Sequence, residues 1–433
     1  MEREFMVLLG FAGMFGLMAL RVPVGIAMGV TGIFGFAAVS GWSPAINLLA
    51  NVPLSVITDY NLSVIPMFVL MGAFASYGGM SRELYNAGRT WLGHFRGGLA
   101  LASIFSCAGF AAINGSSVAT TATMTQIALP EMRRGGYDAG LSAGMIAAGG
   151  TLGIMIPPSV IFVLYGIMTE IDITQLFAAG VFPGLIAVAF YSLIIVFLSY
   201  KYPHLLPRGT KHSWTERRAS VRGLWAIFAL FLMVLGGIYS GIFTVQEAAG
   251  VGAIGALGIG IVRRKLGLAE IRGALIQALR VSSAIMLIVI GAYLFGYFLT
   301  ITQFTQHAVD FLVDLPIGAY GVLALIMLCY IVLGAVMDEL AMLLLTVPIV
   351  VPAIMALGFD PVWFGVILVM AVTLGLISPP VGMNVFVINS IARDVPLTRI
   401  YKGTLPFISV DLLRLVILCA FPAISLWLPS LLE

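Results

Sequence analysis

Apolar runs of membrane-spanning length recur along nearly the whole sequence. About 20 residues suffice for one crossing, because a helix rises ~1.5 Å per residue through a hydrocarbon core of ~30 Å. Eight runs are uninterrupted and are expected to cross as helices: 4–20, 22–40, 61–79, 175–200, 223–241, 244–262, 281–300 and 411–430. Only 9% of the residues are charged, against about 25% in soluble domains. The expected fold class is therefore an all-α integral membrane protein that lies in a lipid bilayer.

Catalytic and metal-binding motifs are missing from the sequence. The cysteines Cys107, Cys329 and Cys419 fall inside apolar segments, which predicts buried thiols and no disulfide framework. No His-Glu-x-x-His, Gly-x-Ser-x-Gly, Cys/His cluster or phosphate-binding loop occurs. We therefore expect no enzyme activity, no cofactor and no nucleic-acid partner. The first residues lack the basic region of a signal peptide, so the first apolar run is expected to remain as a helix.

Basic and acidic residues fall in different connections between the apolar runs. Lys and Arg cluster within 82–96, 133–134, 201–222, 263–280 and 393–402. The alternate connections are acidic, and their acidic residues are Asp59, Glu170, Asp172, Asp310, Asp314 and Asp360. Because cytoplasmic loops of membrane proteins are rich in Lys and Arg, the basic side is expected in the cytoplasm. Both termini are expected on the other side, together with the connections 41–60, 170–174, 239–246, 301–317 and 358–361.

Four further segments are apolar but interrupted near their middles. Segments 98–130 and 318–357 each have both flanks on one side, so each is expected to be a re-entrant hairpin. Their turns are expected at Asn114-Gly-Ser-Ser117 and near Gly334-Ala-Val-Met-Asp-Glu339. Segments 139–169 and 361–391 are long enough to cross but contain Gly and a Pro-Pro pair, which predicts broken helices. The total is about ten crossings plus two hairpins.

An internal repeat relates the two broken crossings. Thr151-Leu-Gly-Ile-Met-Ile-Pro-Pro158 recurs as Thr373-Leu-Gly-Leu-Ile-Ser-Pro-Pro380, an offset of 222 residues. Five crossings lie on each side of the basic linker 201–222, and an odd number per unit turns the second unit upside down. We therefore expect inverted repeats at 1–200 and 223–433. Each would hold scaffold helices (1–80 and 223–300), one hairpin and one broken helix.

The breaks also predict where a site lies and what it binds. Non-helical backbone at membrane depth is tolerated only where it is buried in protein or lines a wet cavity, so the four breaks are expected to converge. Unpaired carbonyls at helix ends suit a small hard cation such as sodium, and unpaired amides at helix starts suit a carboxylate. No Lys or Arg is expected near the midplane, and Arg414 is expected to open the last helix. Polar side chains near the breaks add oxygens: Ser116, Ser117, Thr120, Thr121, Thr123, Thr151, Thr373, Ser378 and Asn384.

Six phrases resemble, in order, motifs of the large membrane subunit of the tripartite ATP-independent periplasmic (TRAP) transporters. They are Arg21-Val-Pro-Val-Gly-Ile-Ala, Asn114-Gly-Ser-Ser, Gly150-Thr-Leu-Gly-Ile-Met-Ile-Pro-Pro-Ser159, Phe243-Thr-Val-Gln-Glu-Ala-Ala249, Met337-Asp-Glu-Leu and Gly375-Leu-Ile-Ser-Pro-Pro-Val-Gly-Met-Asn384. The resemblance covers essentially the whole chain, and the two Pro-Pro segments are its most specific part. In the phrase at 243, Val245-Gln246 replaces the usual Pro-Thr of the family.

The resemblance implies an elevator-type, sodium-coupled permease of the bacterial inner membrane. It implies a small organic acid anion as substrate and sodium ions as coupling ions. It also implies two partners, a small four-helix TRAP membrane subunit and a periplasmic substrate-binding protein. Since 433 residues leave no room for a fused small subunit, that partner is expected to be a separate polypeptide. The alternative is a stand-alone ion-coupled organic-anion permease of the same superfamily.

Site residues follow from the same resemblance. Those implied for substrate lie at the first hairpin tip and at both breaks: Asn114, Ser116, Pro157, Pro158, Ser159, Pro379, Pro380, Gly382 and Asn384. One implied sodium site comprises Asn114, Gly115, Ser116, Ser117, Gly149, Gly150, Thr151 and Gly153. A second comprises Gly334, Asp338, Thr373, Gly375 and Ser378. Asp338 is equally consistent with a helix cap, and a structural role is favoured for Glu247.

Overall fold

The computed structural model describes residues 2–432, with side chains from residue 5 onward. Within this range the chain is helical and no strand forms. Among the residues that the structure describes, six helices are long and apolar enough to cross a membrane, or eight if two bent pairs each count as one span. Shorter apolar helices include 5–19, 24–40 and 361–377. The expected fold class, an all-α integral membrane protein, is confirmed.

Ten helices form the described part of the first half, from residue 2 to residue 201. Their bounds are α1 (Glu2–Ala19), α2 (Val24–Ser40), α3 (Trp42–Thr58), α4 (Val64–Tyr77), α5 (Met80–Leu92), α6 (Gly98–Asn114), α7 (Ser117–Arg134), α8 (Ala139–Met155), α9 (Val160–Thr169) and α10 (Ile173–Lys201). A single 3₁₀ turn, η1 (Asn61–Ser63), precedes α4.

The second half follows the linker helix α11 (Trp214–Arg222). Its elements are α12 (Trp225–Phe231), the π-turn η2 (Leu232–Gly236), α13 (Gly237–Tyr239), α14 (Val245–Val262), α15 (Leu268–Ile301), α16 (Phe304–Val313), α17 (Gly318–Gly334), α18 (Glu339–Ala356), α19 (Pro361–Ile377), α20 (Met383–Ile391), α21 (Leu397–Ala420), α22 (Ala423–Leu426) and the 3₁₀ turn η3 (Pro429–Leu431).

The two hairpins and two broken helices expected from the sequence are present. The hairpins are α6–α7 and α17–α18, and the broken helices are α8–α9 and α19–α20. Helices α7 and α18 begin 222 residues apart, as do α8 and α19. Their N-caps are also 222 residues apart: Ser116 and Asp338 cap α7 and α18, while Asp138 and Asp360 cap α8 and α19. Each cap side chain accepts a hydrogen bond from a first-turn amide, so short polar residues determine where these helices start.

One pair of corresponding segments differs between the halves. In the first half α3 and α4 meet at a bend of 61°. In the second half the corresponding stretch is α15, one helix of 34 residues. The expectation that 41–60 is a connection is therefore wrong, because most of it forms α3. The expected crossing at 281–300 covers only the second part of α15.

The end of the chain also differs from the expectation. A last crossing at 411–430 is wrong, since α21 runs from Leu397 to Ala420 and Pro422 follows directly after its C-cap. The charges of Asp411 and Arg414 suggest a helix start at this point, yet both side chains lie buried inside α21. They are tolerated there because they form an ion pair with each other.

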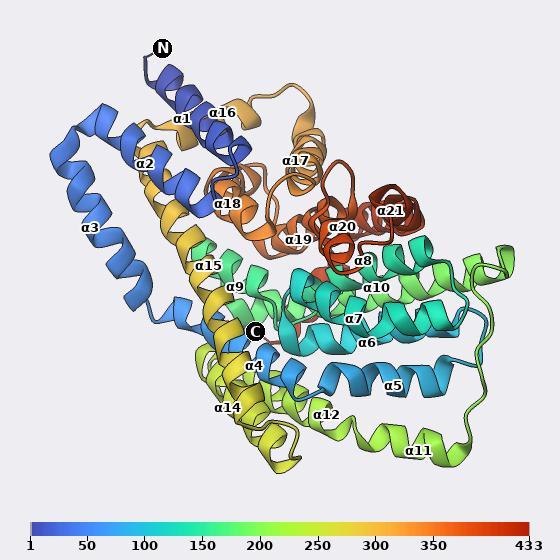
Figure 1. Cartoon of the computed structure of the whole chain (residues 1–433). Coiled ribbons are helices and arrows are strands. Elements are labelled where there is room, and N and C mark those ends of the chain that lie inside the picture. Colours follow the sequence, from blue (N-terminus) through green and yellow to red (C-terminus); the bar gives the residue numbers. More distant parts are fainter. Residues whose placement is uncertain (1, 433) are drawn as a thin grey trace.

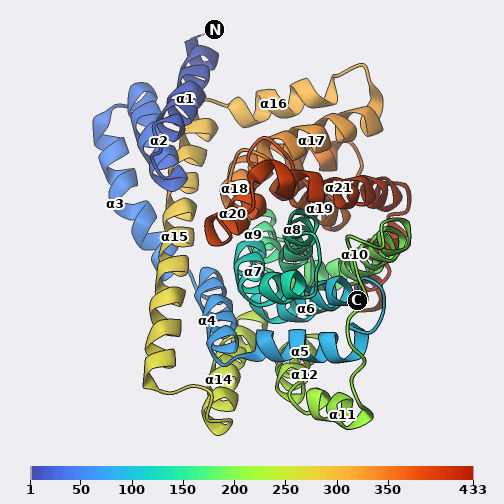
Figure 2. The ribbon, with the colours of Figure 1, turned by 45° about the vertical axis from the view of Figure 1, so that its right-hand side comes forward.

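Helix α15 divides the molecule in both views (Figures 1 and 2). Helix α3 lies on one side of it, and the hairpins and broken helices lie on the other. Helix α2 packs tightly along α15, where a Cβ on Gly25 or Gly32 would come within 2.6 Å of the α15 backbone. Small residues let helix backbones approach closely in a membrane protein. This close packing makes α2 and α15 one unit next to the hairpins.

Candidate functional site

The first hairpin tip lies directly against the first helix break. Helix α6 ends at Asn114, Gly115 follows with a φ of 63°, and Ser116 caps α7. The carbonyl of Gly115 accepts a hydrogen bond of 3.3 Å from the amide of Val160, the first residue of α9. A Cβ on Gly115 would lie 2.6 Å from the carbonyl oxygen of Pro158. Glycine is therefore required at the tip, both for its positive φ and for this close approach.

The second hairpin tip repeats this arrangement at the second break. The carbonyl of Ala335 accepts hydrogen bonds of 3.1 Å from the amides of Val381 and Gly382. Gly382 precedes α20 as Ser159 precedes α9, and the Pro-Pro bonds Pro157–Pro158 and Pro379–Pro380 are both cis. Gly334 lies against Gly375, where a Cβ on Gly375 would be 2.6 Å from the Gly334 backbone. Each hairpin tip is thus hydrogen-bonded to the broken helix of its own half.

A side-chain pair then joins the two halves. Ser117 at the start of α7 and Asn384 in α20 exchange hydrogen bonds of 2.8 and 3.1 Å, and both are fully buried. Asn384 also donates to the carbonyl of Ala147 in α8 at 3.1 Å. The first hairpin, the first broken helix and the second broken helix therefore meet at Asn384. The sequence predicts that all four breaks converge, and three of the interrupted segments meet at this point; the second hairpin joins them through the backbone bonds from Val381 and Gly382 to Ala335.

A cavity of about 370 Å³ lies between the two hairpin tips and the neighbouring helices α4 and α15. Its polar lining residues are Asn114, Ser116, Gln277, Asp338 and Glu339, and most of the others are apolar. It is large enough for a small organic molecule, since ligand cavities begin at roughly 300 Å³. The side that faces α15 is formed by Gln277, Val281, Ala284, Ile285 and Ile288.

Only some of the residues implied for substrate line this cavity. Asn114 and Ser116 do, whereas Pro157, Pro158 and Ser159 are buried behind the first tip. The Ser159 hydroxyl donates to the carbonyl of Ile154 at 2.7 Å. Pro379 and Pro380 are exposed and lie outside the cavity lining, and Gly382 is buried against the second tip. Asn384 does not line the cavity, and neither does Ser117, to which it is hydrogen-bonded.

The residues implied for the first sodium site are close together but point in several directions. Gly153 lies against the backbone of Ser116, Gly150 lies against Thr121, and Gly149 lies against Cys107. The Thr151 hydroxyl donates to the carbonyl of Ala148 at 2.7 Å. Its oxygen also lies 3.3 Å from the Tyr191 hydroxyl, which places Thr151 on the side of α8 that faces α10.

The residues implied for the second sodium site gather around the second tip and α19. The hydroxyls of Thr373 and Ser378 donate to helix carbonyls, those of Met370 and Leu374, at 2.6 Å each. Their oxygens keep lone pairs that a cation could use. Asp338 accepts a hydrogen bond from the Leu340 amide at 3.2 Å, so its capping role is observed. Glu247 completes the capping box of α14, because its carboxylate accepts from the backbone amide and hydroxyl of the N-cap Thr244 at 2.9 and 3.0 Å.

One buried charged group is missing from the sequence-based site. Arg414, expected to open the last helix, lies fully buried six residues before the end of α21. Its Nη2 is 3.0 Å from Oδ1 of Asp411, whose other oxygen accepts a hydrogen bond of 2.6 Å from the Tyr191 hydroxyl. The spacing of Asp411 and Arg414 could have indicated this ion pair, because an Asp and an Arg three residues apart lie on one helix face. Through Tyr191 this group reaches Thr151.

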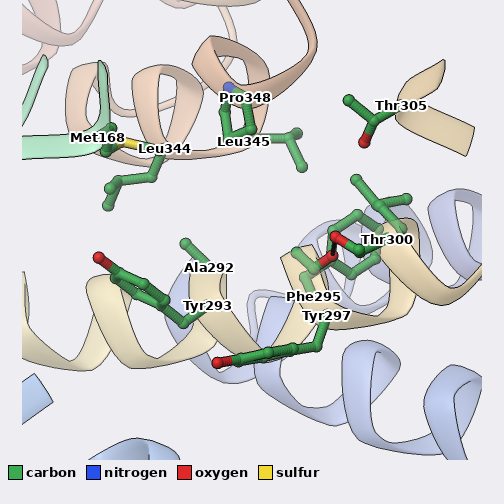
Figure 3. Close-up of a pocket in the computed structure, with 12 residues that line it drawn as sticks. Met168, Ala292, Tyr293, Phe295, Tyr297, Thr300, Thr305, Leu344, Leu345 and Pro348 are labelled. Carbon is green, nitrogen blue, oxygen red and sulfur yellow. Dashed lines mark hydrogen bonds between the residues drawn. The ribbon is translucent and has the colours of Figure 1, made fainter. Parts of the chain in front are cut away.

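A second cavity, of about 280 Å³, follows α15 toward its C-terminal end (Figure 3). Tyr293 and Tyr297 of α15 lie on one side of it, and Leu344 and Pro348 of α18 lie on the other. Most of the lining is apolar. The two cavities therefore lie along one seam, between α15 and the hairpins.

An ion pair at the far end of the first hairpin also connects the two halves. Arg133, near the end of α7, donates two hydrogen bonds of 2.8 and 3.3 Å to the carboxylate of Asp394. Asp394 lies in the connection between α20 and α21. This hydrogen bond lowers the pKa of the Asp394 carboxyl from its ordinary value.

The sequence is similar to known transporter permeases along most of its length. Residues 11–424 match the family described as the tripartite ATP-independent periplasmic transporter, DctM component. The C4-dicarboxylate TRAP transporter large permease protein DctM of Pseudomonas aeruginosa is 36% identical over 374 residues, 86% of this chain and 86% of that protein. The isethionate TRAP transporter permease protein DctMQ of Oleidesulfovibrio alaskensis is 33% identical over 427 residues, 97% of this chain and 66% of that protein.

Among solved structures, the YdaH transporter of Alcanivorax borkumensis has a similar fold. The TM-score is 0.64, with 88% of this chain and 89% of that chain covered. The sequence identity is 15%, so the likeness concerns the fold alone.

Proposed function

Because this chain belongs to the family of tripartite ATP-independent periplasmic transporters, DctM component, and is the large permease subunit of such a transporter, we propose that it imports a small organic acid together with sodium. The acid is delivered by a periplasmic binding protein, and the site crosses the membrane by an elevator movement. The chain is a multi-pass membrane protein. Its relatives in the family include permeases named for C4-dicarboxylate and for isethionate, which supports an organic acid as substrate.

The observation that carries this proposal is the link between the two halves at the cavity. Ser117 and Asn384 exchange buried hydrogen bonds, and both hairpin tips are bonded to their own broken helices. Helices α6–α9 and α17–α20 can therefore move as one body. A rigid body that carries its own site is what an elevator movement requires.

The seam along α15 supports a sliding contact. Both cavities lie between α15 and the hairpins, and their linings are mostly apolar. Apolar surfaces without interlocking ion pairs can shift past each other without exposing unpaired charges. We assign α1–α4 and α12–α15 to the static scaffold. Helices α5 and α16, which precede the two hairpins in the chain, are then the arms that join scaffold and moving body.

Sodium binding is proposed at the hairpin tips, where helix ends and hydroxyls come together. Helices α6 and α17 end at the tips, so their last carbonyls are available to a hard cation. Ser116, Thr373 and Asp338 add side-chain oxygens beside them. The proposed topology has inverted repeats at 1–200 and 223–433, with the basic linker 201–222 in the cytoplasm and both termini outside. The proposed location is the bacterial inner membrane.

The test is uptake by the purified chain in liposomes under an inward sodium gradient. Uptake should require the small membrane subunit and the binding protein, and Ser116→Ala or Thr373→Val should raise the sodium concentration for half-maximal uptake. Equal uptake of micromolar substrate by the chain alone would favour a stand-alone permease. Uptake driven by a proton gradient in sodium-free buffer would contradict sodium as the coupling ion.

A further inference from the structure

Glu339 is a buried carboxylate that the proposed sodium and substrate residues leave unused. It is the first residue of α18, it is 5% exposed, and it lines the 370 Å³ cavity. Among the described residues its Oε2 atom has no hydrogen-bond partner. Asp338 beside it differs, because its side chain caps the helix. Glu339 therefore has an unmet need for a donor or a positive charge.

The charges around the cavity have one sign. Asp338 and Glu339 both line it, and none of its described lining residues is a Lys, Arg or His. The remaining polar lining groups are neutral: Asn114, Ser116 and Gln277. Two like charges close together cost several kcal/mol at an interface. One carboxylate of a dicarboxylate substrate could accept hydrogen bonds from the neutral groups at the first tip. The other would be repelled by Asp338 and Glu339 at the second tip.

The helix start alone does not satisfy Glu339. A carboxylate in the first turn gains from the helix dipole, typically 0.3–1 kcal/mol when exposed. A buried carboxylate without a partner costs several kcal/mol, which is more than the dipole returns. A sodium ion at the proposed second site would supply one positive charge against the two adjacent carboxylates of Asp338 and Glu339, so one negative charge would remain. A cationic group of the substrate can supply the positive charge that balances the remaining carboxylate.

We propose that Glu339 selects an organic acid that also carries a cationic nitrogen, so that the transported molecule is a zwitterion. Its ammonium or amidinium group lies at Glu339. Its carboxylate lies toward the first tip, where Asn114, Ser116 and the start of α7 offer neutral donors. The inference rests on the proposed function, since it names the substrate class of the same cavity.

Two molecules of similar length test the charge requirement directly. Succinate carries a carboxylate at each end, and 4-aminobutanoate carries an ammonium group in place of one of them. Both are titrated with sodium present against the purified complex of this chain and its small membrane subunit. The readout is the half-saturating concentration for thermal stabilisation. The variants are Glu339→Gln, which keeps the shape and removes the charge, and Glu216→Gln, the same change in an exposed carboxylate of the linker helix α11.

In the unmodified protein, 4-aminobutanoate should saturate at the lower concentration. Glu339→Gln should reduce that preference at least tenfold, which corresponds to about 1.4 kcal/mol, while Glu216→Gln should leave it unchanged. Gln277→Lys, at an exposed position of the cavity wall, supplies a second test if Glu339→Gln folds poorly. It adds a competing ammonium group and should shift the preference toward succinate.

Preference of the unmodified protein for succinate, or stabilisation by neither molecule, overturns the proposal. An unchanged preference in Glu339→Gln also overturns the proposal. If the sodium concentration needed for binding rises in that variant, Glu339 belongs to a coupling-ion site. These outcomes leave the proposed transport function intact, because sodium-driven uptake is measured separately with the complete three-part system.

Discussion

Removal of Arg414 should destabilise the protein far more than removal of the whole ion pair. Arg414 and Asp411 are 1% and 0% exposed, and their closest charged atoms are 3.0 Å apart. At an effective dielectric constant of 20, two unit charges at this distance attract by about 5 kcal/mol. Arg414→Met fills much of the same volume but leaves the carboxylate of Asp411 buried without its counter-charge. The expected loss is about 3–5 kcal/mol, the usual result of breaking a buried pair.

The double variant Asp411→Leu/Arg414→Met should recover most of that loss. It leaves no unpaired charge, and replacing a buried pair with apolar side chains is often neutral or stabilising. Tyr191→Phe should fall between the two, at about 1.5–3 kcal/mol, because it removes only a hydrogen bond to a charged group. The expected order of stability is therefore wild type and double variant, then Tyr191→Phe, then Arg414→Met.

The assay is thermal unfolding of the purified complex in one detergent, with all four proteins measured at one heating rate. An irreversible transition still gives the order of stability if the heating rate is held constant. A double variant as unstable as Arg414→Met would refute the reasoning, because the loss would then come from packing and not from unpaired charge. Wild-type stability of Arg414→Met would show that the carboxylate is not held charged by this pair.

Three further predictions concern the site, the packing and the topology. Asn384→Ala removes the buried link to Ser117 and should abolish sodium-driven uptake, while lowering stability by only about 1–3 kcal/mol for its lost hydrogen bonds. The control is Asn389→Ala, which removes a hydrogen bond to Val395 outside the site. Equal uptake by both variants would contradict the role of the link. Gly144→Ala should lower the melting temperature, because its Cβ would overlap the α21 backbone at Gly403, with a cost of about 1–3 kcal/mol; the same change at Gly258, which has open space, should not lower it. In a background without the native cysteines, cysteines at Arg134 and Lys211 should be labelled only from the cytoplasm and those at Glu170 and Ala356 only from outside; labelling of Arg134 from outside would remove the inverted topology.

Much of the fold could be predicted because its signals are local. The Asn-Gly-Ser-Ser turn, the two Pro-Pro breaks and the caps Asp138 and Asp360 all act on backbone within a few residues of themselves. The 222-residue recurrence of the Pro-Pro segments supported the prediction of both broken helices, and the hairpins were predicted from the charged flanks that place both ends of each on one side. The motifs at these breaks also identified the transporter family, which the family match confirms.

The errors arose where local signals were ambiguous. Segment 41–60 carries Pro53 and several polar residues, yet it forms α3, because a helix beside α2 and α15 is stabilised by packing that the segment itself does not record. Asp411 and Arg414 read as the polar start of a helix, although they lie inside one. An Asp–Arg pair buried inside a helix has the same residue types as a polar helix start, so the charges alone did not distinguish the two.

The sequence by itself determined the membrane class, the positions of the breaks and the residue types that surround them. Only the tertiary structure decided which of those residues meet: Ser117 with Asn384, Tyr191 with Asp411, and Glu339 with a cavity that holds no basic side chain. The physical reason is the range of the interactions. A cap or a proline acts through the backbone next to it, whereas a buried hydrogen bond or an unpaired carboxylate depends on how segments more than two hundred residues apart pack together.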